Sequence, residues 1–347
     1  MTPALPSPRG DTTEALLDAL RRPPHSLHPI LPAAGPDPLA DEDLQLALYL
    51  CYELHYRGLP GVDERWEWSP SLLALRQTLE ERFETALRDT VGPVGPAPAP
   101  EEFDVALREI ANADDAPSVS RHVERSATRE QVLEFLAHRS AYQLKEADPH
   151  SWAMPRLSGP PKAALVEIQV DEYGGGRADR MHAQLFADVL EAAGLDARYG
   201  AYVEHLPAAT LATVNLMSLC GLHRRLRGAI VGHLALFEMT SSVPNRRYAA
   251  GLRRLGFDDP AATAFFDEHV TADAVHEAIA AVDLAGGLAR AEPAVAADII
   301  WGAHALLAVD GRWARGLMDA WAKGRSSLRR PLGAPPSQPP AASAAAR

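Results

Sequence analysis

Apolar residues recur every three or four positions along most of the chain, which is the spacing of an amphipathic helix. In the stretch LLALRQTLEERFETALRDTV, for example, Leu72, Leu75, Leu79, Phe83 and Leu87 follow this spacing. Alternation of apolar and polar residues, which would indicate strands, is hard to find. The pattern predicts an all-α protein with helices near residues 41–58, 70–90, 101–113, 127–147, 161–190, 207–220, 223–240, 245–255, 260–281 and 293–321.

Prolines divide this helical chain into parts. Of the 29 prolines, 18 fall in residues 1–40, 91–100 and 331–347. Proline lacks the backbone donor and fixes φ, so these segments are predicted to be linkers or tails. We therefore expect a proline-rich, largely irregular N-terminus over 1–40, an N-terminal helical block over 41–90, a proline-rich loop over 91–100, a large helical domain over 101–325 and a disordered tail over 326–347.

Charge and composition narrow the class of protein. The 34 Lys and Arg against 46 Asp and Glu give a net charge of −12, which argues against binding to nucleic acid. Cys51 and Cys220 are the two cysteines of the 347 residues and stand far apart, so we expect no disulfide framework and a cytoplasmic protein. The best apolar stretch, 228–237, is shorter than the ~18 residues of a membrane span, so no membrane partner is expected.

The segment FFDEHVTADAVHE carries the sharpest candidate for chemistry. His269, Asp273 and His276 are spaced i, i+4 and i+7, which places them on one stripe of a helix about 10 Å long. Two imidazoles with a carboxylate between them form a ligand set for a first-row metal, and helical bundles build such sites from inward-pointing side chains. The alternative is a solvated face that carries two histidines by chance.

A second set lies in VEIQVDEYGGGRADRMHAQLF. Glu172, Asp179 and His182 are spaced i, i+7 and i+10 and would share one stripe of a continuous helix. The glycines at 174–176 cost such a helix about 1 kcal/mol each relative to alanine, so a close backbone neighbour or a small substrate would have to compensate. Alternatively, the glycines end one helix and begin another, and Glu172 is an ordinary surface acid.

Two further glutamates complete the candidates. Glu146 stands at the end of a predicted helix, before Ala-Asp-Pro, and alone would indicate nothing. Glu238 ends the apolar stretch IVGHLALF, where an uncompensated carboxylate is expensive to bury. A metal ion or an arginine would offset that cost, and exposure at a helix end would avoid it.

In this order along the chain, the ligand candidates resemble those of the haem-oxygenase-like di-iron oxidases and oxygenases, bacterial proteins often described as iron-containing redox enzymes. The resemblance covers about residues 125–285 and implies a haem-oxygenase-like helical bundle within the 101–325 domain. It implies metal ligands at Glu146, then Glu172, Asp179 and His182, then His269, Asp273 and His276, with Glu238 as a further carboxylate near the metal.

The resemblance implies two Fe(II) ions per chain, with manganese as the other metal that this ligand set suits, because zinc prefers four ligands with nitrogen and sulfur. It further implies O₂ as co-substrate and a small-molecule substrate that undergoes N-oxygenation, oxidative C–C cleavage or desaturation in bacterial secondary metabolism. No catalytic residues beyond the metal ligands are implied. The sequence has no motif for a flavin, nicotinamide or Fe–S cluster, so an external electron donor is expected, and a homodimer is possible.

Two other functions stay open at this stage: a haem-oxygenase-fold protein without redox chemistry, binding haem or a thiamine-type molecule, and a non-catalytic helical interaction protein. A thiaminase-like relative would need a nucleophilic cysteine. Glu53 and His55 are expected to pack and form hydrogen bonds rather than bind metal. Candidates to pair a substrate carboxylate or to form a pocket wall are Arg121, Arg125, Arg139, Arg246, Arg247, Trp152, Tyr173 and Phe237.

Overall fold

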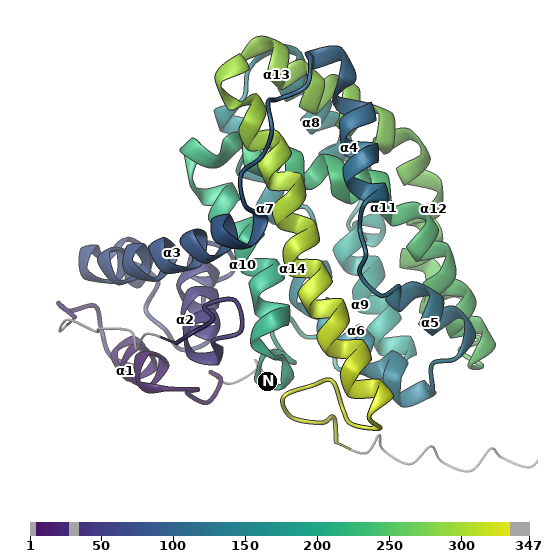
Figure 1. Ribbon diagram of the computed structural model, residues 1–347. Helices are drawn as coiled ribbons and strands as arrows, with labels where there is room; N and C mark the ends of the chain where they lie inside the picture. Colours follow the sequence, from purple (N-terminus) through teal and green to yellow (C-terminus); the bar gives the residue numbers. More distant parts are fainter. Residues whose placement is uncertain (1–4, 28–34, 334–347) are drawn as a thin grey trace, which may run out of the picture.

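The computed structural model describes residues 5–27 and 35–333, except for the side chains of residues 271–275. The described residues form helices and loops and contain no strand, which confirms the all-α prediction (Figure 1). An N-terminal block consists of α1 (Asp11–Leu20), α2 (Glu42–Glu53) and α3 (Pro70–Val91). The bundle beside it consists of α4 (Phe103–Asn112), α5 (Val119–Arg125), α6 (Arg129–Gln143), α7 (Asp148–Ser151), α8 (Gly159–Glu172), α9 (His182–Ala192), α10 (Ala208–Leu222), α11 (Arg227–Arg254), α12 (Ala261–Ala278), a π-helical segment (Ile279–Gly286), α13 (Gly287–Ala291) and α14 (Ala296–Ala322).

Helices α11 and α14 cross at the centre of the bundle with their backbones in contact. A Cβ atom on Gly232 of α11 would lie 1.8 Å from the carbonyl oxygen of Ile299, and one on Gly302 of α14 would lie 2.0 Å from that of Ala229. Real side chains do not approach so closely, so only glycine fits at either position. The crossing fixes the position of α11, which also packs against α12.

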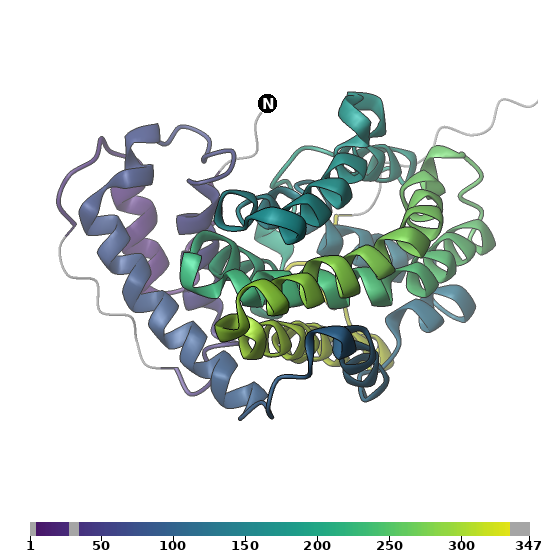
Figure 2. The same cartoon turned by 90° about the horizontal axis from the view of Figure 1, so that it is seen from above.

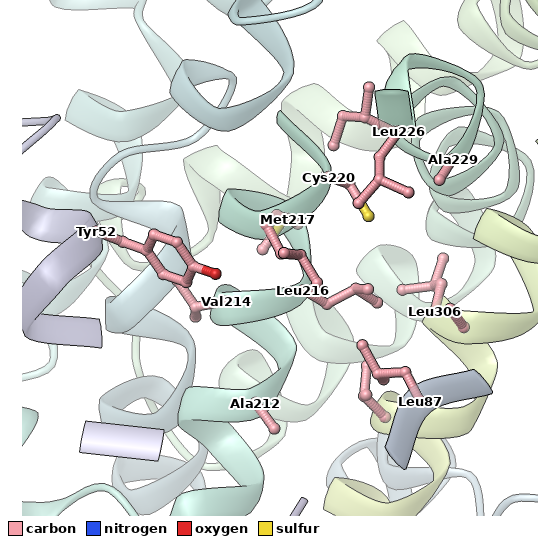
Figure 3. Close-up of a cluster of buried hydrophobic side chains, with 14 of the residues drawn as sticks. Tyr52, Leu87, Ala212, Val214, Leu216, Met217, Cys220, Leu226, Ala229 and Leu306 are labelled. Carbon is pink, nitrogen blue, oxygen red and sulfur yellow. The ribbon is translucent and has the colours of Figure 1, made fainter. Parts of the chain in front are cut away.

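The N-terminal block shares its hydrophobic core with the bundle through α10. Figure 3 shows Tyr52 of α2 on one side of α10, and Leu306 of α14 with Leu87 of α3 on the other side. The buried face of α10 between them includes Val214 and Met217. The view from above shows α1 to α3 stacked at one end of the bundle (Figure 2). The block is therefore packed on the bundle rather than tethered to it.

A buried ion pair joins the block to the bundle. The Nζ of Lys145, just after α6, donates a hydrogen bond to Oε1 of Glu53 at the end of α2, and both side chains are almost fully buried. Tyr199 donates its hydroxyl hydrogen to the other oxygen of Glu53 at 2.5 Å. His55 lies between Glu67 and Arg76. Glu53 and His55 thus form hydrogen bonds within the protein, as expected from the sequence.

Several predicted boundaries differ from the structure. Helix α1 lies inside 1–40, where the sequence predicts largely irregular structure; its Leu16, Leu17 and Leu20 are buried in the shared core. The predicted helices 223–240 and 245–255 form the single helix α11, with Pro244 inside it. Proline removes one helical hydrogen bond, but α11 continues through Pro244, because the helix packs against α5, α12 and α14.

The predicted tail also differs in part. Residues 326–333 are not helical, but Ser327 donates a hydrogen bond to Glu134 Oε2 at 2.7 Å and Leu328 is buried. This portion therefore packs on the bundle instead of being disordered. Residues 334–347, like 1–4 and 28–34, lie outside the described part of the chain.

Helix α14 is long and apolar, whereas the sequence analysis took residues 228–237 as the best apolar stretch. In the part of the chain that the structure describes, the segment Pro293–Ala322 is long and apolar enough to cross a membrane. However, 61% of its most apolar 18 residues are buried inside the protein. Its composition is thus that of a central core helix, which contacts α3, α10 and α11.

Candidate metal centre

Six of the eight predicted ligands gather in one buried cluster. Their side chains could offer ligand atoms in two groups, and within each group these atoms lie within 4.8 Å of one another. The first group is Glu146, Glu172, His182 and His269, and the second is Glu172, Glu238 and His276. All six residues are at most 6% exposed. Glu172 belongs to both groups, so one carboxylate stands between two potential metal positions.

Glu172 and His182 come from the ends of two different helices. Glu172 is the last residue of α8, and His182 is the first residue of α9. The glycines at 174–176 all have positive φ values, from 61° to 81°, which glycine adopts without strain. The chain reverses there and brings His182 Nδ1 within 3.0 Å of Glu172 Oε2. In the continuous helix predicted over 161–190, the two residues would be about 15 Å apart, so that prediction is wrong. The alternative is right that the glycines separate two helices, but wrong that Glu172 is a surface acid, because its side chain is buried.

Glu146 lies in a turn that follows α6. The next residue, Ala147, has φ 72° and is the only residue other than glycine with a positive φ in the described chain. A left-handed alanine costs of order 1–3 kcal/mol and needs support from its surroundings. Gln169 of α8 supplies it, because its Nε2 donates a hydrogen bond to the Ala147 carbonyl at 2.9 Å. The Glu146 carboxylate is thereby directed inward, with Oε1 3.7 Å from His269 Nε2.

Hydrogen bonds fix the orientation of the two α12 histidines. His269 donates from Nδ1 to the carbonyl of Phe265 at 2.7 Å, so its Nε2 faces the cluster without a hydrogen. His276 uses Nε2 to donate to Asp171 Oδ2 at 3.0 Å, while its Nδ1 lies 3.4 Å from Glu238 Oε2. Sequence reasoning missed Asp171, although its position directly before Glu172 offered a signal. Such outer carboxylates commonly orient metal-bound imidazoles.

The cluster shifts the pKa values of its own members in opposite directions. Burial raises the pKa of Glu172, but the positive charge of His182 and the other histidines outweighs this and lowers it to about 2. Burial raises the pKa of Glu238. Burial lowers the pKa of His269 to about 4, with the neighbouring His182 adding to the effect. Burial also lowers the pKa of His276, but the adjacent Glu238 carboxylate and the hydrogen bond to Asp171 raise it overall to about 9.

The arrangement of these side chains fits a bound metal ion better than it fits hydrogen bonds between them. His182 Nδ1 and His276 Nδ1 are buried and form no hydrogen bond within the described residues, although a carboxylate oxygen lies 3.0 or 3.4 Å from each. Buried polar atoms are normally satisfied, and close nitrogen and oxygen atoms without hydrogen-bond geometry are expected where both face a common cation. A set of carboxylates and imidazoles projecting into a helical bundle suits iron or manganese.

The structure does not bring the other two predicted ligands into the cluster. Asp179 lies in the loop between α8 and α9 with a side chain that is 71% exposed, and it pairs with Arg177 at 2.9 Å. The prediction that Asp179 is a ligand is therefore wrong, because it assumed a helix that the glycines interrupt. Asp273 is on α12, but its side chain lies outside the described part of the structure.

The cysteines do not support thiamine-type chemistry. Cys51 and Cys220 are both buried. Burial raises the pKa of Cys51 to about 12 and that of Cys220 still further. A nucleophilic cysteine instead needs a lowered pKa and access to its substrate.

A cavity of about 250 Å³ reaches the cluster along α6, and we name it the α6 cavity. Glu146 and His269 form part of its wall, so it opens directly beside the first group of candidate ligands. Of the residues that the sequence proposed for a substrate pocket, Arg139 and Phe237 line it, and the other six do not. Asp310 of α14 adds a carboxylate to the same cavity.

Comparison with known proteins agrees with this geometry. A family model described as iron-containing redox enzyme matches residues 133–311, just over half of the chain, and this span contains all six residues of the cluster. The curated proteins contain no match to the chain.

Proposed function

The chain belongs to the family of iron-containing redox enzymes, and from that premise we propose that it is an O₂-dependent oxidoreductase with two Fe(II) ions in the buried cluster. Its substrate is a small molecule that undergoes N-oxygenation, oxidative C–C cleavage or desaturation, in bacterial secondary metabolism. Manganese is the alternative metal for the same ligands.

The observation that carries this proposal is the position of Glu172. It offers an oxygen to the Glu146, His182 and His269 group and to the Glu238 and His276 group. A single metal ion would need only one of these groups. Three carboxylates and three imidazoles would also be an expensive set to bury without cations, because each uncompensated charge loses its hydration.

The residues of the chain have two tasks in this proposal: they hold the ions and they orient the imidazoles. Glu146, His182 and His269 would hold one ion and Glu238 and His276 the other, and Glu172 would offer its carboxylate to both groups. When bound, a pair of ferrous ions supplies electrons for the reduction of O₂. Phe265 and Asp171 hold the two α12 imidazoles in their tautomers through the hydrogen bonds described above.

The α6 cavity is the place for the substrate, because its wall includes the ligand residues Glu146 and His269. The rings of Phe237 and Phe265 line the same region and would exclude water from the reacting groups. The electrons that return iron to the ferrous state come from an external donor, since the sequence carries no motif for an organic redox cofactor or an Fe–S cluster.

Anaerobic titration with Fe(II) tests the proposal. We expect about two ions per chain, followed by faster O₂ consumption when a substrate is present. Glu172→Gln keeps the side-chain volume and should weaken both sites at once, because it removes the shared charge. Glu167→Gln on the exposed face of the same helix is the matched control and should still bind two ions. Failure of the wild-type protein to bind iron or manganese would refute the proposal.

A further inference from the structure

One side of α8 combines exposed apolar and acidic side chains. Ala163, Val166 and Val170 are spaced i, i+3 and i+7 and form an exposed apolar stripe. Glu167 and Asp171 are also exposed and form an acidic stripe beside it, because each directly follows a valine, about 100° further around the helix. Val166 is 37% and Val170 is 51% exposed. Apolar side chains in a row on the solvent side of a helix, unlike single ones, indicate a contact surface.

The π-helical segment after α12 runs antiparallel to α8 and contacts it. At one end, His276, shortly before the segment, donates its hydrogen bond to Asp171. At the other end, a Cβ atom on Gly287 would lie 3.5 Å from Pro161 Cγ. The segment therefore extends the surface of α8 sideways along its length.

Two residues of this segment add to the same mixture of apolar and acidic groups. Val282 is 51% exposed. It lies near the level of Val166, because it stands six residues after His276 and Val166 stands five residues before Asp171. Asp283 follows it and is exposed as well. We name the combined surface the α8 face and define it by these residues: Ala163, Val166, Glu167, Val170, Asp171, Val282 and Asp283.

The acids of the α8 face give it a negative charge. Within the described residues, Glu167, Asp171 and Asp283 form no ion pair with a lysine or arginine, and Asp171 pairs with His276. The base of α8, Lys162, lies in the first turn of the helix. Apolar residues flanked by acids are complementary to a partner whose apolar patch is flanked by bases.

The α8 face is one hydrogen bond away from the candidate metal centre. Asp171 has a side chain that is 60% exposed, and it accepts the hydrogen bond from Nε2 of His276, which is 1% exposed. The Nδ1 of the same imidazole faces the Glu238 carboxylate inside the cluster. One side chain therefore connects the surface with a candidate metal ligand. Electron transfer through proteins slows steeply with distance, so such a short connection favours it.

These properties fit a transient electron-transfer partner better than a permanent subunit. Encounters between redox proteins bury small surfaces and are weak, and complementary charge speeds their association. A permanent interface would need a larger and more apolar surface. The apolar residues of the α8 face are few and lie beside unpaired acids.

We propose that the α8 face is the docking surface of the electron donor, a protein that exposes the edge of a one-electron cofactor in an apolar patch ringed by lysine and arginine. Each docked donor is oxidised by one electron and reduces one Fe(III) ion to Fe(II), so two donors are oxidised for each pair of Fe(II) ions formed. An acidic carrier protein would be repelled by Glu167, Asp171 and Asp283. The need for a donor rests on the proposed function; the binding of a basic protein to this face does not.

Cross-linking to cytochrome c locates the docking surface on the full, metal-free chain. Lysines surround the exposed haem edge of this probe, and its succinylated form, in which those lysines carry carboxylates, is the matched control. A carbodiimide joins a carboxylate to a lysine amine in contact with it, with loss of water, and mass spectrometry identifies the linked acids. Links at Glu167 and Asp283 should exceed those at Glu14 on α1 about fivefold or more, and succinylation should abolish them. Links spread evenly over the exposed acids would overturn the inference.

Two variants test the acidic and the apolar part of the face separately, by calorimetry with cytochrome c at low ionic strength. Glu167→Lys should raise Kd about fivefold, because an attraction becomes a repulsion. Val170→Ser should raise it about threefold, because apolar contact area is lost. Glu14→Lys and Val243→Ser are the matched controls at exposed positions of α1 and α11, and should change Kd by less than about twofold.

The same proteins, loaded anaerobically with Fe(II), test the route of the electron. Each Fe(II) ion should pass one electron to one ferric haem of cytochrome c, and the absorbance of the ferrous haem measures the rate in stopped flow. Glu167→Lys and Val170→Ser should slow this transfer by the same factors as they weaken binding, with unchanged iron content. Transfer that neither variant slows would overturn the inference.

Iron content separates this inference from the proposed function. A chain that binds cytochrome c at the α8 face but takes up neither iron nor manganese would refute the proposed function alone. A chain that binds two iron ions but is cross-linked to cytochrome c at other surfaces would refute the docking surface alone.

Discussion

Replacement of Glu53 by glutamine tests whether the ion pair between the N-terminal block and the bundle stabilises the protein. The Lys145 side chain has no exposed surface, and its charge is compensated by Glu53. Its Nζ also lies near the rings of Tyr56, with a centroid at 4.1 Å, and Tyr49, at 5.4 Å, and its charge acts on Asp148 without an ion pair. Glu53→Gln retains the size of the side chain but leaves a buried ammonium group without its hydrogen-bonded counter-charge.

The expected loss follows from that burial. Removing one partner of a buried pair costs about 3–5 kcal/mol, and the lower value applies here because the glutamine oxygen can still accept one hydrogen bond. An unfolding entropy of about 2.1 cal/mol/K per residue over the chain gives roughly 0.7 kcal/mol/K. A loss of about 3 kcal/mol should therefore lower Tm by about 4 °C.

Differential scanning calorimetry of four proteins measures the effect: wild type, Glu53→Gln, Lys145→Met and the double variant. The double variant removes both charges and should recover more than half of the Tm lost by Glu53→Gln, because no unpaired charge remains. If Glu53→Gln melts within 1 °C of wild type, or the double variant is no more stable than it, the ammonium of Lys145 is not held as described.

Three further predictions follow from single positions. Asp179→Asn should leave the Fe(II) stoichiometry unchanged in anaerobic titration, because the Asp179 side chain points to solvent; a lost ion would restore it as a ligand. Gly232→Ala should destabilise the protein by about 3 kcal/mol in urea unfolding, since its Cβ would meet the Ile299 carbonyl. Gly316→Ala, in open space on α14, should instead stabilise by about 0.5 kcal/mol or more, and equal effects of the two would contradict the crossing geometry. Burial lowers the pKa of His138 to about 3, from about 6.5 in the unfolded chain. As pH falls from 6.5 toward 3, the unfolded chain therefore binds a proton at His138 that the folded protein does not, and the free energy of unfolding decreases. Between pH 6 and 4 the free energy of unfolding of the wild type should fall by about 1.4 kcal/mol per pH unit more than that of His138→Gln. Parallel plots of unfolding free energy against pH for the two proteins would refute this.

Helix spacing predicted the fold well because apolar burial determines it. The 3.6-residue pattern gave the long helices α3, α10, α12 and α14 to within a few residues. It missed α1, a ten-residue helix between proline-rich segments that packs only because α2 lies beside it. Local sequence carries little information about such tertiary support.

The site was predicted in composition but not in geometry. Glu172 and His182 belong together as expected, but a chain reversal at the glycines unites them rather than a shared helical stripe. The same error placed Asp179 inward. Asp171 acquires its role only through a hydrogen bond between two helices, which a single sequence does not reveal.

The ion pair between Glu53 and Lys145 also affects how the protein can evolve. The family match begins at residue 133, yet the charge of Lys145 within it is neutralised by a residue of the N-terminal block. The matched segment of this chain therefore depends on the block for the counter-charge of a buried lysine. A related chain that lost the block would keep an unpaired buried ammonium group, directly beside the candidate ligand Glu146, unless Lys145 changed at the same time.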